Sequence, residues 1–190
     1  MPNWCANAVT IEATEIEGAQ ILRRLKNHID DGNGFFSFIK PIPPELDDIR
    51  TGSYGGDDAK EKNELRSKLV EKYGYSGWYD WCVDNWGTKW DARIDDSFLE
   101  DDVLTIYFDT AWSPPAPIYQ ELYEKFSMVV TASFVEIGAN YIGYYRSGEY
   151  HDEVFITEFA DNENEEVDYF ENVITYMDDR FLPTPNHTGG

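Results

Sequence analysis

The apolar residues of this 190-residue chain recur at helical spacing in two places, each flanked by stretches in which apolar and polar residues alternate. The alternation predicts strands over residues 7–13 and 128–136, whereas the helical spacing predicts helices over residues 14–29 and 114–126. Neither kind of element can bury its apolar side alone. The two periods therefore predict a sheet covered by helices.

Both predicted helices begin at residues that suit a helix N-terminus. Thr14 and Glu17 have capping-box spacing, in which two side chains accept hydrogen bonds from each other's backbone N–H groups. Ser113 is the expected N-cap of the second helix, because Pro114 suits the first helical position.

The stretch WYDWCVDNWGTKWDA, residues 78–92, holds four of the six tryptophans of the chain. Helical spacing up to Gly87 predicts a short helix, and Gly87 suits the left-handed residue after a helix end. The period then changes to two, which predicts a strand over residues 89–94. That strand is expected to pair with residues 103–109 around an acidic turn, residues 96–102.

The predicted order is strand, helix, inserted segment, strand, strand, helix, strand. This order belongs to the α+β class and predicts a ferredoxin-like split βαβ fold, an antiparallel sheet with two helices on one face. The insertion covers about residues 31–77. Its charged helical run, residues 60–73, has only a thin apolar stripe and is expected to be peripheral.

The chain is predicted to divide into two parts. Residues 1–148 form the ferredoxin-like domain with its insertion, and residues 149–190 form an acidic C-terminal extension with an extra strand, a helix and a frayed end. Residues 141–146 and 153–159 are expected to extend the sheet as a hairpin.

The net charge of −22 is unevenly distributed. Residues 1–90 carry 15 acidic and 11 basic side chains, whereas residues 91–190 carry 22 acidic and 4 basic ones. An acidic body repels phosphate backbones and anionic membranes, so direct binding of nucleic acid or membrane is not expected. Basic partners are attracted instead, including host proteins and nucleoprotein complexes that bind nucleic acid.

Composition also argues against several other classes of protein. The apolar runs are too short to span a bilayer, and the first residues lack a basic leader, so we expect a protein of the bacterial host cytosol. Cys5 and Cys82 are then expected to be reduced thiols. The three histidines and two cysteines have no metal-ligand spacing, and neither a metal nor a cofactor is predicted.

Five separated motifs are shared with a known family: MPNWCANAVTI, FSFIKPIPPEL, WYDWCVDNWGTKWDA, FDTAWSPP and EIGANYIGYYRSG. Together they resemble the YubB-like family of ferredoxin-like proteins from bacteriophages, conjugative plasmids and genomic islands. The resemblance covers Met1 to Gly148. It implies a ferredoxin-like fold and a mobile-element origin, and it implies no particular activity, because the function of that family is unknown.

The tryptophans have two interpretations. The favoured one is a structural aromatic cluster in the core, made of Trp4, Trp78, Trp81, Trp86, Trp90 and Trp112. The alternative is a platform on which bases or sugars stack, which needs cations to follow a phosphate backbone. Residues 78–92 supply only Lys89 against three aspartates.

An enzyme is the least favoured of the three functions considered for this chain. A nucleophile with its base, a carboxylate pair in a cleft or a phosphate-binding loop is needed, and none stands out. Cys82 is expected to be a small buried apolar residue. No catalytic residue is therefore predicted.

The acidic residues give the leading functional prediction. A partner-binding acidic surface is predicted from Asp95, Asp96, Glu100, Asp101, Asp102, Glu149, Asp152, Glu153, Glu158, Asp161, Glu163, Glu165, Glu166 and Asp168. Exposed aromatics are expected to contribute, namely Tyr144, Tyr145, Tyr150 and Tyr169.

The spacing of carboxylates on a folded surface can imitate a phosphate track coarsely. We therefore predict a non-enzymatic inhibitor, of the anti-CRISPR or anti-restriction type, that binds a host defence complex in competition with DNA and acts as a DNA mimic. The alternative is an accessory protein-binding module in plasmid transfer or phage replication, in which acidity serves only solubility.

Overall fold

A six-stranded antiparallel sheet is the centre of the computed structural model, which describes residues 3–47, 59–136, 138 and 141–154. The strands are β1 (Trp4–Ala13), β2 (Arg93–Glu100), β3 (Val103–Ala111), β4 (Met128–Glu136), β5 (Tyr141–Arg146) and β6 (Glu149–Val154). Their order in the sheet is β2-β3-β1-β4-β5-β6. The helices are α1 (Ile16–Asp30), α2 (Phe35–Ile39), α3 (Pro44–Asp47), α4 (Ala59–Tyr73), α5 (Trp78–Trp86) and α6 (Ala116–Phe126).

Alternation along β1 creates the two faces of the sheet. Cys5, Asn7, Val9 and Ile11 are buried, and their neighbours in the strand are more exposed. Val9 lies between Ile106 of β3 and Ala132 of β4, which are buried as well. Side chains two residues apart in a strand share a face, so this register produces one continuous apolar face.

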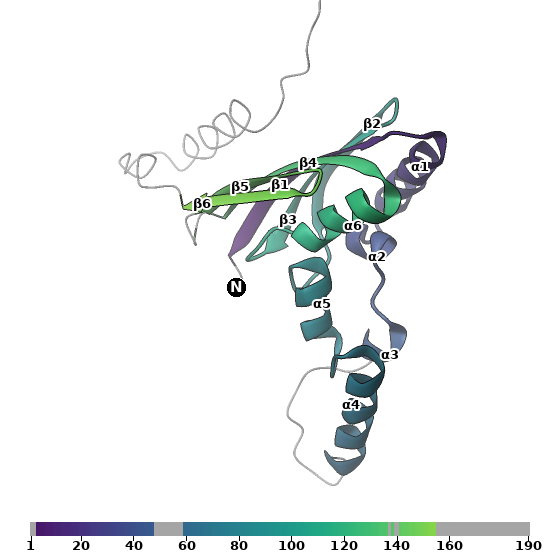
Figure 1. The fold of residues 1–190 in the computed structure, drawn as a ribbon, viewed down its shortest axis with the longest axis vertical. Coiled ribbons are helices and arrows are strands. Elements are labelled where there is room, and N and C mark those ends of the chain that lie inside the picture. The colour runs from purple at the N-terminus through teal and green to yellow at the C-terminus, as the bar shows by residue number, and fades with distance from the viewer. Residues whose placement is uncertain (1–2, 48–58, 137, 139–140, 155–190) are drawn as a thin grey trace, which may run out of the picture.

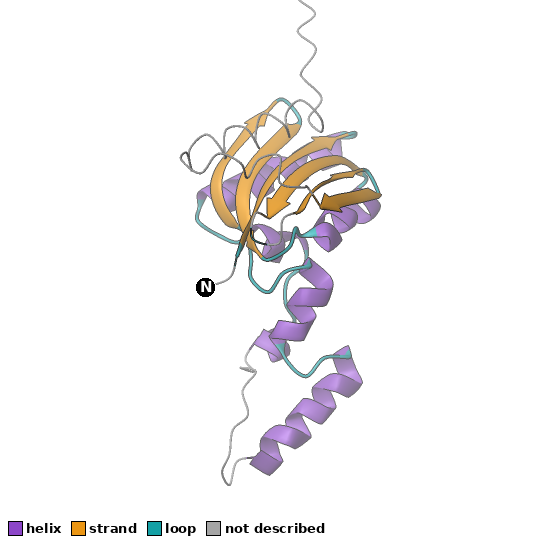
Figure 2. Ribbon diagram, turned by 90° about the vertical axis from the view of Figure 1, so that its left-hand side faces the viewer, coloured by secondary structure: helices purple, strands orange, loops and turns teal. Residues whose placement is uncertain are grey.

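Helices cover that apolar face. Helix α1 packs against β1, β2 and β3, helix α6 packs against β4, and α2 contacts both α1 and α6 (Figure 1). Figure 2 views the sheet with these helices behind it. Among the described residues, no helix lies on the opposite face of the sheet. The predicted α+β class is confirmed.

The inserted segment divides into a core part and a peripheral part. Phe35, Phe36, Ile39 and Leu46 from α2 and α3 are buried in the main core. Helix α4, by contrast, extends away from the sheet (Figure 1) and is exposed along most of its described length. The prediction that the charged helix is peripheral agrees with the structure, whereas α2 and α3 before it contribute buried side chains to the core.

Polar contacts attach the inserted segment to its surroundings. The Asp91 carboxylate accepts hydrogen bonds from the backbone N–H groups of Phe36 and Ser37, at 2.8 and 2.9 Å. A side-chain carbon on Gly34 would lie 2.1 Å from that carboxylate, so a larger residue there would displace Asp91. On the outer side, Lys72 of α4 donates two hydrogen bonds to Glu45 of α3, at 2.9 and 2.8 Å.

Two predicted helix caps are wrong. Helix α1 begins after Glu15 without a side-chain cap, because the Thr14 hydroxyl donates instead to the backbone carbonyl of Ser127 at 3.0 Å. Helix α6 begins after Pro115, and the Ser113 hydroxyl donates to the carbonyl of Gly87. Both hydroxyls make tertiary contacts that the local sequence does not reveal.

The predicted strand and turn after α5 are also shifted. Helix α5 ends at Gly87 in the left-handed conformation, as predicted. Strand β2, however, begins only at Arg93, and residues 96–100 belong to it, so that the turn is reduced to Asp101 and Asp102. The pairing of β2 with β3 also contains a register shift between Ile94 and Asp96, which the alternation in the sequence does not reveal.

The C-terminal hairpin is tighter than predicted. Strand β5 has the predicted bounds, but its partner β6 starts at Glu149, directly after a two-residue turn. Ser147 and Gly148 both have positive φ, as a two-residue hairpin turn of type I′ requires. The predicted domain boundary at residue 148 therefore falls inside a hairpin of the sheet. The predicted tail helix lies outside the described residues.

Candidate functional site

Strand β2 places five acidic residues at one edge of the sheet. Asp95, Asp96 and Glu100 are exposed on the strand, and Asp101 and Asp102 are exposed in the turn that follows. Asp95 is the additional residue of the register shift, which leaves it without a partner residue in β3. We refer to these five residues as the acidic edge.

Local contacts orient two members of the acidic edge. Asp96 accepts a hydrogen bond from the backbone N–H of Ser97 at 2.8 Å. Asp102 accepts one from the Arg23 guanidinium of α1 at 2.9 Å, and both side chains are more than half exposed. An exposed ion pair of this kind contributes little to stability and can exchange partners.

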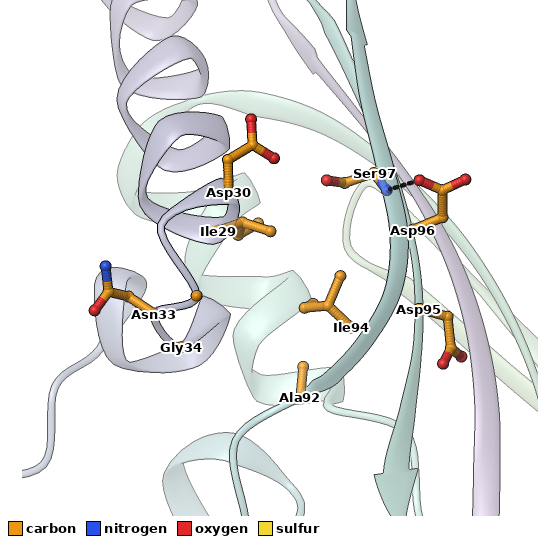
Figure 3. A pocket seen from close by; sticks show the side chains of 10 residues that line it. Ile29, Asp30, Asn33, Gly34, Ala92, Ile94, Asp95, Asp96 and Ser97 are labelled. Atoms are coloured by element: carbon orange, nitrogen blue, oxygen red, sulfur yellow. Dashed lines mark hydrogen bonds between the residues drawn. The ribbon is translucent and has the colours of Figure 1, made fainter.

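An open pocket of about 470 Å³ lies between the end of α1 and β2. Its lining residues are Ile29, Asp30, Gly32, Asn33, Gly34, Ala92, Ile94, Asp95, Asp96 and Ser97. In Figure 3, Asp30 points from α1 toward β2, whereas Asp95 and Asp96 project from the far side of β2. The pocket therefore adds one carboxylate that the sequence interpretation omitted. This carboxylate is already paired with the Lys26 ammonium one turn earlier in α1, at 2.6 Å.

The remaining predicted acidic residues are only partly placed. Glu149 is exposed at the start of β6. Asp152 and Glu153 lie in the same strand. Glu158, Asp161, Glu163, Glu165, Glu166 and Asp168 lie outside the described residues.

The tyrosines that were expected at the partner-binding surface differ in how exposed they are. Tyr150 is 46% exposed and Tyr144 is partly buried. Tyr145 was expected at the surface, but it is buried and its hydroxyl donates to the Gln120 side chain at 2.9 Å. The reason is its register opposite Ala132, which places it on the helix-covered face. Tyr169 lies outside the described residues.

The six tryptophans do not form one buried cluster. Trp81 and Trp86 are buried with ring centroids 5.8 Å apart, and the Trp86 indole donates to the carbonyl of Lys40 at 2.8 Å. Trp78 is partly buried. Trp4, Trp90 and Trp112 are 40%, 42% and 43% exposed, so the expectation of a core position is wrong for these three.

Two buried polar groups of the core are the Cys82 thiol and the Tyr119 hydroxyl. Burial raises the pKa of the Cys82 thiol to about 12, so this thiol stays protonated at neutral pH. The Tyr119 hydroxyl is fully buried and donates to Asn7 at 3.2 Å, and Asn7 in turn donates to Thr110 at 2.9 Å. Both groups therefore belong to the packed core of the described part of the chain.

Within the described ranges, no three His, Cys, Asp or Glu side chains gather closely enough to hold a metal ion. No helix within those ranges has the length and apolar character needed to cross a bilayer.

The pKa of the Asp109 carboxyl in β3 is shifted by burial and by charged neighbours. Burial raises the pKa of its carboxyl, repulsion from Asp95 raises it further, and Arg93 opposes both effects. Because the folded-state pKa lies above the unfolded value, Asp109 favours the fold at low pH. That contribution is lost as the pH rises through the raised pKa.

Replacement of Asp109 by asparagine is therefore expected to raise the melting temperature by a few degrees near pH 7. Thermal unfolding of both proteins across the acidic range measures the effect. The gain must shrink as the pH falls through the raised pKa of Asp109, and it must vanish well below the ordinary pKa of a carboxyl, about 4, where Asp109 is protonated in both states. A gain of the same size at all pH values would contradict this explanation.

The fold and its surface define an α+β protein with an acidic edge strand, and comparison with known proteins sharpens the class. Residues 85–177 match a family model described as the ferredoxin-like domain in Api92-like protein. The match includes β2, β3, α6, β4, β5 and β6. The predicted ferredoxin-like class is confirmed, whereas a mobile-element origin stays a prediction.

Among solved structures, the chain is similar to the crystal structure of a protein api92 from Yersinia pseudotuberculosis. The identity is 11%, the TM-score is 0.39, and the alignment covers 83% of this chain and 99% of that chain. None of the curated proteins matches the sequence significantly.

Proposed function

We propose that this chain is a non-enzymatic protein of a mobile genetic element that acts in the cytosol of a bacterial host. It is an inhibitor of the anti-CRISPR or anti-restriction type, which binds a nucleic-acid-binding defence complex of the host and competes with DNA. The observation that carries this proposal is the acidic edge, five exposed carboxylates on one strand and its turn. A basic groove that binds DNA is complementary to such a surface.

The geometry of a strand supports coarse imitation of a phosphate track. Residues on one face of a strand repeat about every 6.8 Å, and one DNA strand presents a phosphate about every 3.4 Å along the axis. Asp96 and Glu100 lie two such repeats apart, which corresponds to about four phosphate steps. The separation of Asp96 and Glu100 along the strand therefore matches the separation of phosphates about four steps apart along a DNA strand.

For the architecture we propose the split βαβ arrangement. Strands β1, β2, β3 and β4, with α1 and α6 between them in the chain, have the sequence order that this arrangement needs. Their order in the sheet, β2-β3-β1-β4, supports it. The acidic residues after β6 are proposed to extend the same anionic character.

One observation favours a second candidate, an accessory binding module in plasmid transfer or phage replication. Strand β2 is an edge strand with a register shift and repeated charges, and both features prevent edge-to-edge aggregation. In that case the carboxylates keep the edge soluble and do not bind DNA-binding proteins.

Capture from a host lysate at low and at high salt tests the first candidate. We expect immobilised protein to retain a basic nucleic-acid-binding complex at low salt and to release it at high salt, where the Debye length falls to about 3 Å at 1 M. DNA binding by the recovered and purified complex should then decline as this protein is added.

The result that decides against inhibition is a recovered complex whose DNA binding does not change at saturating protein. Such a complex would instead fit the accessory module. Failure to retain any basic partner at low salt would contradict both the electrostatic argument and the inhibitor.

A further inference from the structure

Three exposed tryptophans gather on the surface although they come from three separate segments. Trp4 opens β1, Trp90 lies between α5 and β2, and Trp112 lies between β3 and α6. The ring centroids of Trp4 and Trp90 are 6.3 Å apart at an interplanar angle of 37°. Exposed aromatic groups collected in one place mark interaction sites more often than isolated ones do.

Cations already lie on these rings. The Lys89 ammonium is 3.7 Å from the ring centroid of Trp90 and 4.0 Å from that of Trp112. The Arg93 guanidinium carbon is 5.8 Å from the Trp4 centroid. An indole face attracts a cation through its quadrupole, so Lys89 shows that the space beside Trp90 and Trp112 accepts a positive group. We call Trp4, Trp90 and Trp112 with Lys89 and Arg93 the tryptophan cluster.

The backbone holds the cluster in position. Trp112 has φ of 70°, a left-handed conformation that costs energy for a bulky residue. Its N–H donates to the carbonyl of Asn3 at 3.0 Å, and the Thr88 hydroxyl donates to the carbonyl of Ala111 at 2.9 Å. The indole is therefore presented at the surface by a fixed frame, which lowers the entropic cost of binding.

We propose that the tryptophan cluster receives an arginine side chain of the basic partner, and that Lys89 occupies this place in the free protein. The inference rests on the proposed function and names the chemistry by which the partner is held. A guanidinium is planar and more weakly hydrated than an ammonium, so it stacks on indole more favourably and displaces Lys89. The acidic edge continues from the same segment of chain and attracts further basic side chains.

A nucleic-acid strand fits the cluster less well. The five exposed carboxylates of the acidic edge follow Trp90 in the chain and repel a phosphate backbone. Residues 89–124 contain only two basic side chains, Lys89 and Arg93, which are outnumbered by the five carboxylates of the acidic edge. A single strand is therefore an outcome of the test and not the proposed ligand.

Calorimetric titration with an arginine homopeptide and a lysine homopeptide of equal length tests the proposal. The intact protein is expected to bind the arginine peptide about fivefold more tightly. Replacement of both Trp90 and Trp112 by alanine should abolish this preference while it retains the affinity common to both peptides. Replacement of Tyr123, an exposed aromatic on α6, by alanine is the matched control and should leave the preference intact.

Lys89→Gln gives the most specific result. If Lys89 only supports the local structure, this change leaves the ratio of the two affinities unaltered. If Lys89 competes with the partner, the arginine peptide should bind about threefold more tightly, because both the competitor and a like charge are removed. Trp112→Phe keeps an aromatic face and is expected to retain part of the preference.

The outcomes separate the two proposals. Equal affinities that the tryptophan replacements do not alter would overturn the role of the cluster and leave the acidic edge as the binding surface. Absence of binding by either peptide would overturn the proposed function as well. Binding of a single-stranded oligonucleotide that depends on Trp90 and Trp112 would replace arginine with a nucleic-acid ligand and overturn this inference.

Discussion

Replacement of Phe36 by alanine is expected to lower the free energy of unfolding by about 3–5 kcal/mol. Phe36 is fully buried, and its ring contacts Trp86 and Phe108 at centroid distances of 5.8 and 5.9 Å. The substitution leaves a cavity between the inserted segment and the sheet, and it removes edge contacts between rings. Urea unfolding followed by tryptophan fluorescence measures the change.

The matched control is Val70→Ala in α4. Val70 is 47% exposed on the peripheral helix, so its replacement should cost less than about 1 kcal/mol. Similar losses for the two variants would mean that α2 and α4 are equally important to the core. A small loss for Phe36 alone would show that the inserted segment packs more loosely than its burial indicates.

Neutralisation of the acidic edge is expected to lower the rate of association with a basic partner roughly 10- to 100-fold. The variant replaces Asp95, Asp96, Glu100, Asp101 and Asp102 by their amides. Exposed carboxylates steer encounter over long range, so their loss acts mainly on the association rate and reduces its salt dependence. Surface plasmon resonance with the captured complex at several salt concentrations measures both quantities.

A second variant controls for total charge. It neutralises five exposed acidic residues away from β2, namely Glu15, Glu17, Glu64, Glu71 and Asp84. Both variants lose the same net charge, so only a local acidic site makes the first one slower. Equal rates for the two variants would mean that overall acidity, and not the acidic edge, attracts the partner.

Local periodicity predicted the regular elements well where a strand or helix buries one continuous face. Strand β4 has the predicted bounds, and α5 ends at Gly87 as its conformational freedom suggested. The prediction failed at Thr14 and Ser113, because both hydroxyls bond to backbone groups far away in the chain. Caps depend on competing tertiary acceptors that a local pattern does not contain.

The candidate site was predictable in its chemistry and less so in its arrangement. Asp96 and Glu100 were predicted to lie in a turn, but they lie in strand β2. Asp30 lies across the pocket from β2 because the end of α1 faces that strand. Proximity of this kind depends on packing between segments more than sixty residues apart.

The sequence by itself determined the α+β class, the order of the main elements and the excess of negative charge, since each follows from local period and composition. Only the tertiary structure decided which aromatic residues are buried. Trp86 and Trp90 lie four residues apart, yet one packs against Phe36 and the other is exposed beside Lys89. The left-handed turn at Gly87 separates them, so that Trp86 belongs to α5 and Trp90 lies beyond the end of that helix. Burial depends on what packs against a side chain, which neighbours in the sequence do not specify.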